Sequence, residues 1–283
     1  MRPSQINFLD RNFIIEIDNY NNNRKYDVDI ISRAVELDRP EFLNSMLLSV
    51  FEGSQGPCID SQTIKQDIFR EATALGQFFT KSKNDSAAFL GNPLEPLLAM
   101  VDHRENEEKV ELASFSKILE ILPKENKATE CAEKFNIFMD YVVANKDAWG
   151  MGKLAVLAAI FGNAGARGVL KLNKNRSEKL IFNAYSDLKK ISMKPMLNDL
   201  AHQMNGACPK FRLVIGDVPL QKFSDVVEFN SVTSKNSISG FEVSLEVSSK
   251  KFIEELPFLI DRVKLKNKVI EEFFDSKSGG SSD

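Results

Sequence analysis

Apolar residues recur at the spacing of an α-helix through most of this chain, and that spacing limits the fold more than any other feature of the sequence. Ile64, Ile68, Ala72, Leu75 and Phe79, for example, fall on one helical face. Similar segments, bounded by Pro, Gly or polar residues, predict helices over 28–37, 40–53, 61–81, 107–122, 129–145, 154–161, 177–193 and 195–206, and a helical pair kinked at Pro257 over 250–275. The segment 154–161 is apolar all round, which predicts a buried helix.

The apolar spacing changes to that of a β-strand after Gly206. Phe241, Val243, Leu245 and Val247 alternate with polar residues, as a strand with one buried face requires. Shorter strands are predicted over 211–215 and 226–230, and over 12–18 near the N-terminus, where Phe13, Ile15 and Ile17 would share a face.

These patterns predict a mainly α (α+β) protein with a helical body and a small antiparallel sheet in the C-terminal part. The expected domains are a helical domain with an N-terminal strand over 1–206 and a small α+β domain over 207–275. The Gly/Ser-rich tail over 276–283 is expected to be disordered.

Composition is that of an ordinary globular protein, with 43% hydrophobic and 27% charged residues. The three cysteines are widely spaced and odd in number, which argues against a disulfide framework and for a reducing compartment. No apolar run reaches the ~18 residues that a membrane span needs. We therefore expect no membrane partner and a cytoplasmic location.

One segment, 153–194, is basic in an otherwise acidic chain. It carries nine cationic residues against Glu178 and Asp187, a net charge of +7, whereas the whole chain has 37 cationic and 40 acidic residues. Such asymmetry is typical of a surface that binds a polyanion. The candidate nucleic-acid-binding residues are Lys153, Arg167, Lys171, Lys174, Arg176, Lys179, Lys189 and Lys190.

Gly162, Gly165 and Gly168, together with Arg167, suggest a flexible loop within 162–175 that brings backbone N–H groups close to a phosphate. Binding would then be to the phosphate backbone and would depend strongly on salt. The alternative is that these lysines form the solvated face of helices that bury their apolar side.

No set of residues indicates a known catalytic or metal-binding motif. Gly150, Gly152 and Ala155 have the spacing of a dinucleotide-binding loop, but no strand precedes them and no βαβ unit surrounds them. The two histidines, His103 and His202, lack metal-ligand spacing. We therefore expect no cofactor, no metal and no enzymatic activity of a familiar type, although catalytic groups can converge from distant parts of a chain.

The sequence favours a non-enzymatic nucleic-acid-binding protein that holds single-stranded RNA in the manner of a nucleocapsid protein, with self-association as a further expectation. Charge reversal at Lys171, Lys174 and Arg176 would then weaken RNA binding and flatten its salt dependence. The alternative function is that of a protein–protein interaction module: an adaptor, an inhibitor or an effector that binds no nucleic acid.

Overall fold

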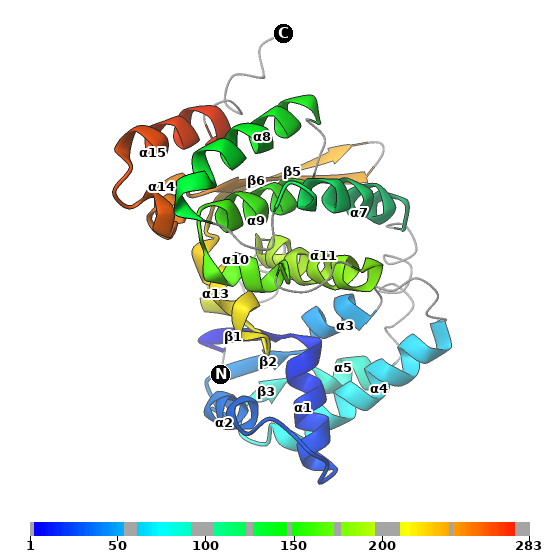
Figure 1. The fold of residues 1–283 in the computed structure, drawn as a ribbon. Helices are drawn as coiled ribbons and strands as arrows, with labels where there is room; N and C mark the ends of the chain where they lie inside the picture. The colour runs from blue at the N-terminus through cyan, green and yellow to red at the C-terminus, as the bar shows by residue number, and fades with distance from the viewer. Residues whose placement is uncertain are drawn as a thin grey trace. The chain divides into compact units, whose positions relative to one another are not determined.

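The computed structural model describes residues 3–53, 61–91, 105–122, 127–145, 149–172, 177–195, 210–237 and 240–274. Helices predominate, as predicted (Figure 1). The chain divides into two compact units, each made of two stretches of sequence. Unit 1 comprises Met1–Glu107 and Met196–Asp217, and unit 2 comprises Glu108–Pro195 and Val218–Asp283. The sequence-based division at residue 206 instead assigned one continuous stretch to each domain.

Unit 1 is built on a four-stranded parallel sheet in the order β3-β2-β1-β4. Its strands are β1 (Gln5–Leu9), β2 (Phe42–Ser45), β3 (Lys83–Asn84) and β4 (Lys210–Val214). In register, Leu9 of β1 lies opposite Val214 of β4, and Phe8 lies opposite Ser45 of β2. The predicted antiparallel C-terminal sheet is therefore wrong for the main sheet, which is parallel and mostly N-terminal. Of the strands predicted from sequence, 211–215 is confirmed as β4.

The helices of unit 1 connect these strands. They are α1 (Arg11–Asn21), α2 (Val28–Leu37), α3 (Leu47–Gly53), α4 (Ser61–Phe78) and α5 (Ser86–Leu90). The structure confirms the predicted helices 28–37 and 61–81 as α2 and α4. The predicted helix 40–53 is wrong in its first part, which forms β2 before α3 begins.

The strand predicted over 12–18 is wrong, because this segment belongs to α1. Asp10 caps the helix by accepting a hydrogen bond from the Phe13 amide at 2.8 Å. The residues that α1 buries are Phe13, Ile14 and Ile17, at helical rather than alternating spacing. A short apolar run satisfies both patterns, and the cap decides between them.

The core of unit 1 forms where α1, α2 and α4 bury their apolar faces together with the ends of β1 and β4. Fully buried members include Leu9, Phe13, Ala34, Ala72 and Leu75. A parallel strand connected through helices is normally covered on both faces, and Ile6, Phe8 and Leu9 of β1 are accordingly all buried.

Unit 2 is helical apart from one pair of strands, among the residues described. Its elements are α7 (Glu105–Leu119), which leads into the unit, η1 (Ala128–Glu130), α8 (Cys131–Ala144), α9 (Gly150–Ile160), α10 (Ala164–Val169), α11 (Glu178–Ser192), α13 (Val218–Val226), β5 (Phe229–Ser237), β6 (Gly240–Val247), α14 (Ser249–Glu254), η2 (Pro257–Leu259), α15 (Val263–Val269) and η3 (Ile270–Phe274).

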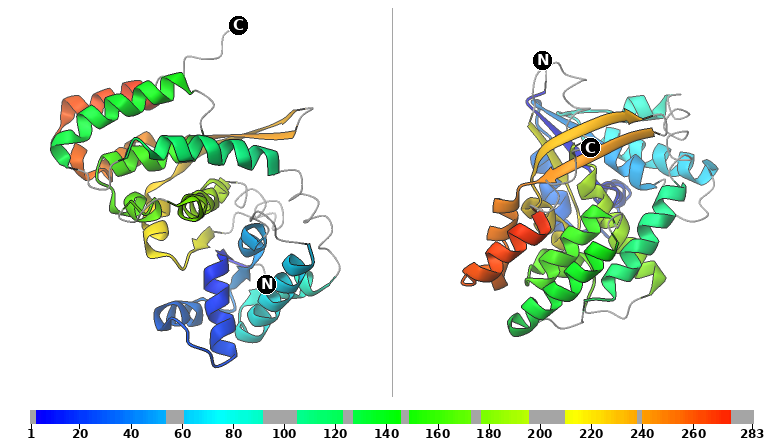
Figure 2. Two further views of the ribbon diagram at one scale, coloured as in Figure 1. Left: turned by 45° about the vertical axis from the view of Figure 1, so that its right-hand side comes forward. Right: turned by 90° about the horizontal axis from the view of Figure 1, so that it is seen from above.

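The strands β5 and β6 form an antiparallel pair, so the strong alternation of 241–248 does indicate a strand. Helix α9 is buried on all sides, as its sequence predicts. Figure 2 shows α15 beside α8, where Lys268 donates to the Asn136 side chain at 2.7 Å. The predicted tail 276–283 lies outside the described residues. No helix among the described residues is both long enough and apolar enough to cross a bilayer.

Candidate functional site

The predicted glycine loop is a helix packed in the interior of unit 2. Gly165 and Gly168 lie in α10, where they face α13. A Cβ atom on Gly165 would lie 2.8 Å from the Phe223 amide nitrogen, and one on Gly168 would lie 2.6 Å from Cβ of Pro219. These glycines allow two helices to approach closely, so the prediction of a phosphate-binding loop is wrong for residues 164–169.

Several candidate cations of unit 2 are buried or already paired. Lys153 and Lys190 are each only 4% exposed. Asp187 lies 3.3 Å from the Lys190 ammonium and 3.6 Å from that of Lys171, which places two of the predicted phosphate ligands on one carboxylate. The surface offered to a polyanion is correspondingly smaller than the sequence suggests.

The remaining predicted nucleic-acid-binding residues differ in how far they are exposed to solvent. Burial lowers the pKa of Arg167. Lys189 lies over the ring of the buried Tyr185 and donates to its hydroxyl group at 3.3 Å. Lys179 is exposed. Lys174 and Arg176 lie outside the described residues. The described candidates therefore include buried and paired side chains as well as exposed ones, and Lys153 and Lys190 belong neither to an exposed patch nor to a solvated face.

A group of acidic side chains lies at the carboxyl edge of the parallel sheet in unit 1. In an open parallel sheet, ligands bind outside the carboxyl ends of the strands, at the point where the strand order reverses. Here the chain proceeds from β1 outward to β2 and β3, and β4 is on the opposite side of β1. The reversal point is therefore between β1 and β4.

Asp10 occupies this reversal point. It follows β1 directly and is fully buried, and its backbone amide donates to the carbonyl of Val214 at 3.0 Å. Its Oδ1 accepts hydrogen bonds from the amides of Phe13 at 2.8 Å and Gly216 at 3.2 Å. One carboxylate oxygen is thus held by α1 and by the residue after β4. Asp217 comes next in the chain, three residues after the end of β4.

Glu52, from α3, brings a third carboxylate to this edge. Its Oε2 accepts a hydrogen bond from the backbone amide of Arg11 at 2.5 Å, so it lies beside the peptide that follows Asp10. Asp10 and Glu52 therefore lie at this edge from distant parts of the sequence, and Asp217 directly follows Gly216, whose amide donates to Asp10. We call these three residues the candidate acidic site.

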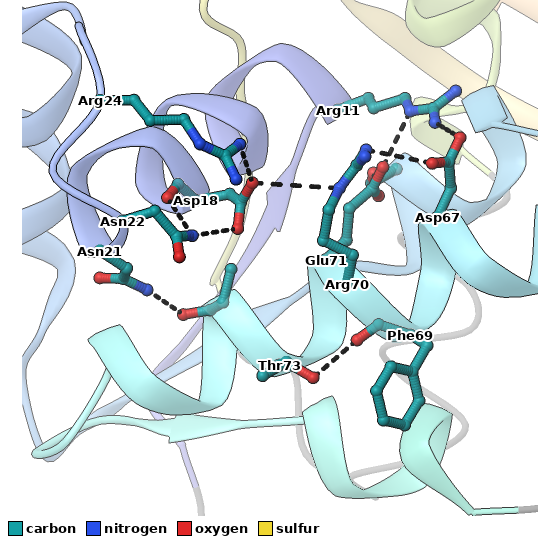
Figure 3. A network of polar contacts seen from close by, with 12 residues as sticks. Arg11, Asp18, Asn21, Asn22, Arg24, Asp67, Phe69, Arg70, Glu71 and Thr73 are labelled. Carbon is teal, nitrogen blue, oxygen red and sulfur yellow. Dashed lines mark hydrogen bonds and ion pairs between the residues drawn. The ribbon is translucent and has the colours of Figure 1, made fainter.

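Arg11 anchors the adjoining polar network, shown in Figure 3. Its guanidinium group donates to Glu71 at 2.9 Å and also pairs with Asp67, both of α4. Glu71 is 2% exposed and accepts a further hydrogen bond from the Ser49 hydroxyl. The network continues along α1 and α4 through Arg70, which pairs with Asp67 at 3.1 Å.

Two opposing effects set the pKa values in this network: burial, which disfavours the charged form, and pairing with opposite charges or hydrogen-bond donors, which favours it. Burial alone would lower the pKa of Arg11, but its attraction to Glu71 and its hydrogen bonds to Glu71 and Asp67 raise that pKa. Burial raises the pKa of Glu71, which the Ser49 hydrogen bond and Arg11 oppose only in part. Burial likewise raises the pKa of Asp85, although Ser45 and the Met46 amide donate to it at 2.5 and 3.0 Å.

Compared with protein-family models, curated proteins and solved structures, the chain matches none at a significant level.

Sequence reasoning missed the candidate acidic site because its residues are separated by up to 207 positions. Two local signals exist in retrospect. Asp10 follows the apolar residues Phe8 and Leu9, and Asp217 follows the apolar run 213–215 and Gly216. A carboxylate at the end of a buried strand is a common position for functional groups in parallel sheets, but only once the strands are known to be parallel.

Proposed function

We propose that the protein is a divalent-cation-dependent hydrolase that cleaves phosphodiester bonds in nucleic acid, with Asp10, Glu52 and Asp217 as the cation-binding residues. The observation that carries this proposal is the position of Asp10 and Glu52 at the reversal point between β1 and β4, where Gly216, the residue before Asp217, donates to Asp10. The position of such sites in parallel sheets supports it as an analogy of fold.

Carboxylate oxygens suit hard cations such as Mg²⁺ and Mn²⁺. Within the described ranges, no group of three or more His, Cys, Asp or Glu side chains could hold a metal ion. Mg²⁺ does not require such a cage, because it commonly binds through one or two carboxylates, several waters and the phosphate of a substrate. The candidate acidic site has the ligands for that mode, with the substrate completing the coordination.

Nucleic acid enters the proposal as the ligand that the net charge of segment 153–194 predicts from sequence. Carboxylates repel a phosphodiester unless a cation lies between them, and a bridging cation also polarises the phosphoryl oxygen and lowers the pKa of a bound water. In the proposed reaction, that water attacks phosphorus, one P–O ester bond breaks, and the leaving oxygen takes up a proton as the water loses one. Single-stranded RNA, the ligand expected from sequence, is the first substrate to test.

The test is cleavage of single-stranded RNA and DNA in the presence of Mg²⁺ or Mn²⁺. We expect the wild-type protein to cleave these substrates and to lose this activity in EDTA. Asp10→Asn should lower the cleavage rate at least about a hundredfold, since removing one charge-stabilising group typically costs that much. Glu36→Gln, which neutralises an exposed carboxylate on α2, is the matched control and should cleave normally.

Two other outcomes would contradict the proposal in different ways. Cation-independent RNA binding without cleavage would favour the non-enzymatic nucleic-acid-binding function expected from sequence. A protein that neither binds nor cleaves RNA or DNA would instead favour the function of a protein–protein interaction module.

A further inference from the structure

A pocket of about 440 Å³ opens in unit 1 at the C-terminal end of α1. It is lined by Tyr20, Asn21, Asn23, Tyr26 and Gln77. Helix α1 has 11 residues, so at ~1.5 Å per residue the pocket lies about 15 Å along the helix from Arg11. It is therefore separate from the candidate acidic site.

The two tyrosines give the pocket an aromatic wall. Tyr20 is 43% exposed and Tyr26 is 38% exposed, and their ring centroids are 5.2 Å apart in an edge-to-face arrangement. The ring of Tyr20 also packs edge-to-face against that of Phe78, with 5.7 Å between the ring centroids. Large aromatic side chains are usually buried more fully when their only role is packing. Exposed rings on a firm support are suited to stacking against a flat ligand.

Amide groups line the rest of the pocket. Asn21 donates to the carbonyl of Ala74 at 3.0 Å, which fixes its orientation (Figure 3). The structure shows no side-chain hydrogen bond from Asn23 or Gln77 to the described part of the protein, and both residues are exposed. An amide side chain offers one donor and one acceptor side by side, which matches the paired donor and acceptor on the edge of adenine.

Two cationic residues belong to the same loop as the pocket residues Asn23 and Tyr26. Arg24 and Lys25 lie between two of the lining residues, Asn23 and Tyr26. The Arg24 side chain is 60% exposed, and its contact with Asp18, at 3.4 Å, leaves most of the guanidinium group in solvent. A flat ring beside a negative charge fits this combination, and a neutral sugar does not use the two cations.

We propose that this pocket binds one base of a single-stranded nucleic acid, with adenine preferred, by stacking on Tyr20 and Tyr26 and by hydrogen bonds to Asn23 and Gln77. Arg24 and Lys25 contact the adjoining phosphate. The assignment deepens the proposed function and rests on it for the class of ligand. It adds a second point of attachment that holds the strand while the candidate acidic site acts elsewhere on it.

The test is fluorescence anisotropy with a labelled short oligoadenylate RNA in EDTA, so that binding is measured without cleavage. Tyr26→Ala should bind roughly tenfold more weakly, because one base–aromatic stack is lost. Tyr26→Phe keeps the ring and should bind like the wild type. Phe69→Ala, which removes an aromatic ring that is 60% exposed on α4 but does not line the pocket, is the matched control. Gln77→Ala, a change at an exposed position, should weaken binding about threefold through one lost hydrogen bond.

Unchanged affinity in both Tyr26→Ala and Gln77→Ala would overturn the assignment, as would a wild-type protein that does not bind oligoadenylate. Equal affinity for a neutral oligosaccharide, with the same dependence on Tyr26, would also overturn it. If Tyr26→Ala weakens binding but no RNA is cleaved with Mg²⁺, the pocket stands and the hydrolase proposal fails. If RNA is cleaved but Tyr26→Ala and Gln77→Ala bind normally, the reverse holds.

Discussion

The backbone amide of Gly216 donates a hydrogen bond to Oδ1 of Asp10 at 3.2 Å, although 206 positions separate the two residues. Asp10 directly follows β1 and Gly216 comes shortly after β4, so this bond extends the pairing of the two strands beyond the last register pair, Leu9 with Val214. The same oxygen caps α1 through Phe13. One side chain therefore fixes a helix, the end of a strand and the position of the candidate acidic site.

Replacement of Asp10 by alanine should lower the free energy of unfolding. The change removes the cap of α1 and the acceptor for Gly216, and these losses together should cost about 2 kcal/mol. Asp10→Asn retains a side-chain oxygen and should cost less than Asp10→Ala. Urea unfolding monitored by circular dichroism measures both variants, and equal stability of wild type and Asp10→Ala would show that the cap does not form.

The pair of Arg11 and Glu71 should be coupled strongly in stability. Arg11→Ala leaves the Glu71 carboxylate, 2% exposed, without its cationic partner, and should cost about 3 kcal/mol. The double variant Arg11→Met/Glu71→Leu replaces the ion pair by apolar groups and should recover much of that loss. A double-mutant cycle of Arg11→Met and Glu71→Leu, measured in urea, gives the coupling energy. Additive effects of Arg11→Met and Glu71→Leu would contradict the pairing seen in the structure.

Gly165 should not tolerate a methyl group. An alanine Cβ would lie 2.8 Å from the Phe223 amide nitrogen, a backbone atom that cannot rotate away, and Gly165→Ala should destabilise the protein by about 2 kcal/mol. Gly150, at the start of α9, has nothing within 4 Å of the same position. Gly150→Ala should therefore be neutral or slightly stabilising. Thermal unfolding compares the two, and a flexible loop at 162–175 would instead accept both changes.

Asp38 should contribute to stability only above acidic pH. Burial would raise its pKa, but hydrogen bonds from the amides of Ser82 and Lys81, at 2.8 and 2.9 Å, lower that pKa below its ordinary value. A lowered folded-state pKa gives stability that is present above the unfolded-state value, about 3.9, and is lost as the pH falls through the folded-state value. Asp38→Asn should thus be less stable than wild type at pH 7, with the difference shrinking below about pH 4. A difference that stays constant with pH would show that the carboxylate charge plays no part.

Helical spacing predicted most of the helices, because most of them bury one apolar face. The segment 28–37 is helical over the predicted residues, and α9 is buried all round as its composition requires. The strand predicted over 12–18 failed because apolar residues at 13, 14, 15 and 17 fit both periods. The cap from Asp10 was the signal that separates them.

The parallel sheet could not be predicted from the same patterns. Its strands β2 and β3 have only four and two residues, too short for any period to show. Pairing between β1 and β4 joins residues near position 7 with residues near position 212, and nothing local indicates such a partner. The candidate acidic site depends on that pairing, so it became visible only with the fold.

For the basic segment 153–194, the sequence predicted a site that the structure does not support. Its net charge suggested one cationic surface, but Lys153 of α9 is buried, and Asp187 lies beside both Lys171 and Lys190. Net charge over a segment counts residues regardless of the direction in which a helix presents them. The nucleic-acid proposal now depends more on unit 1 than on this segment.

Titration with Mn²⁺, with the free ion followed by electron paramagnetic resonance, tests whether the carboxylates at the reversal point between β1 and β4 bind a divalent cation. We expect wild type and Glu36→Gln to bind Mn²⁺ alike, and Asp10→Asn and Asp217→Asn each to bind it at least about tenfold more weakly, a loss of roughly 1.4 kcal/mol. Absence of Mn²⁺ binding to the wild type in the presence of a single-stranded oligonucleotide, or equal binding by all four proteins, would contradict this expectation.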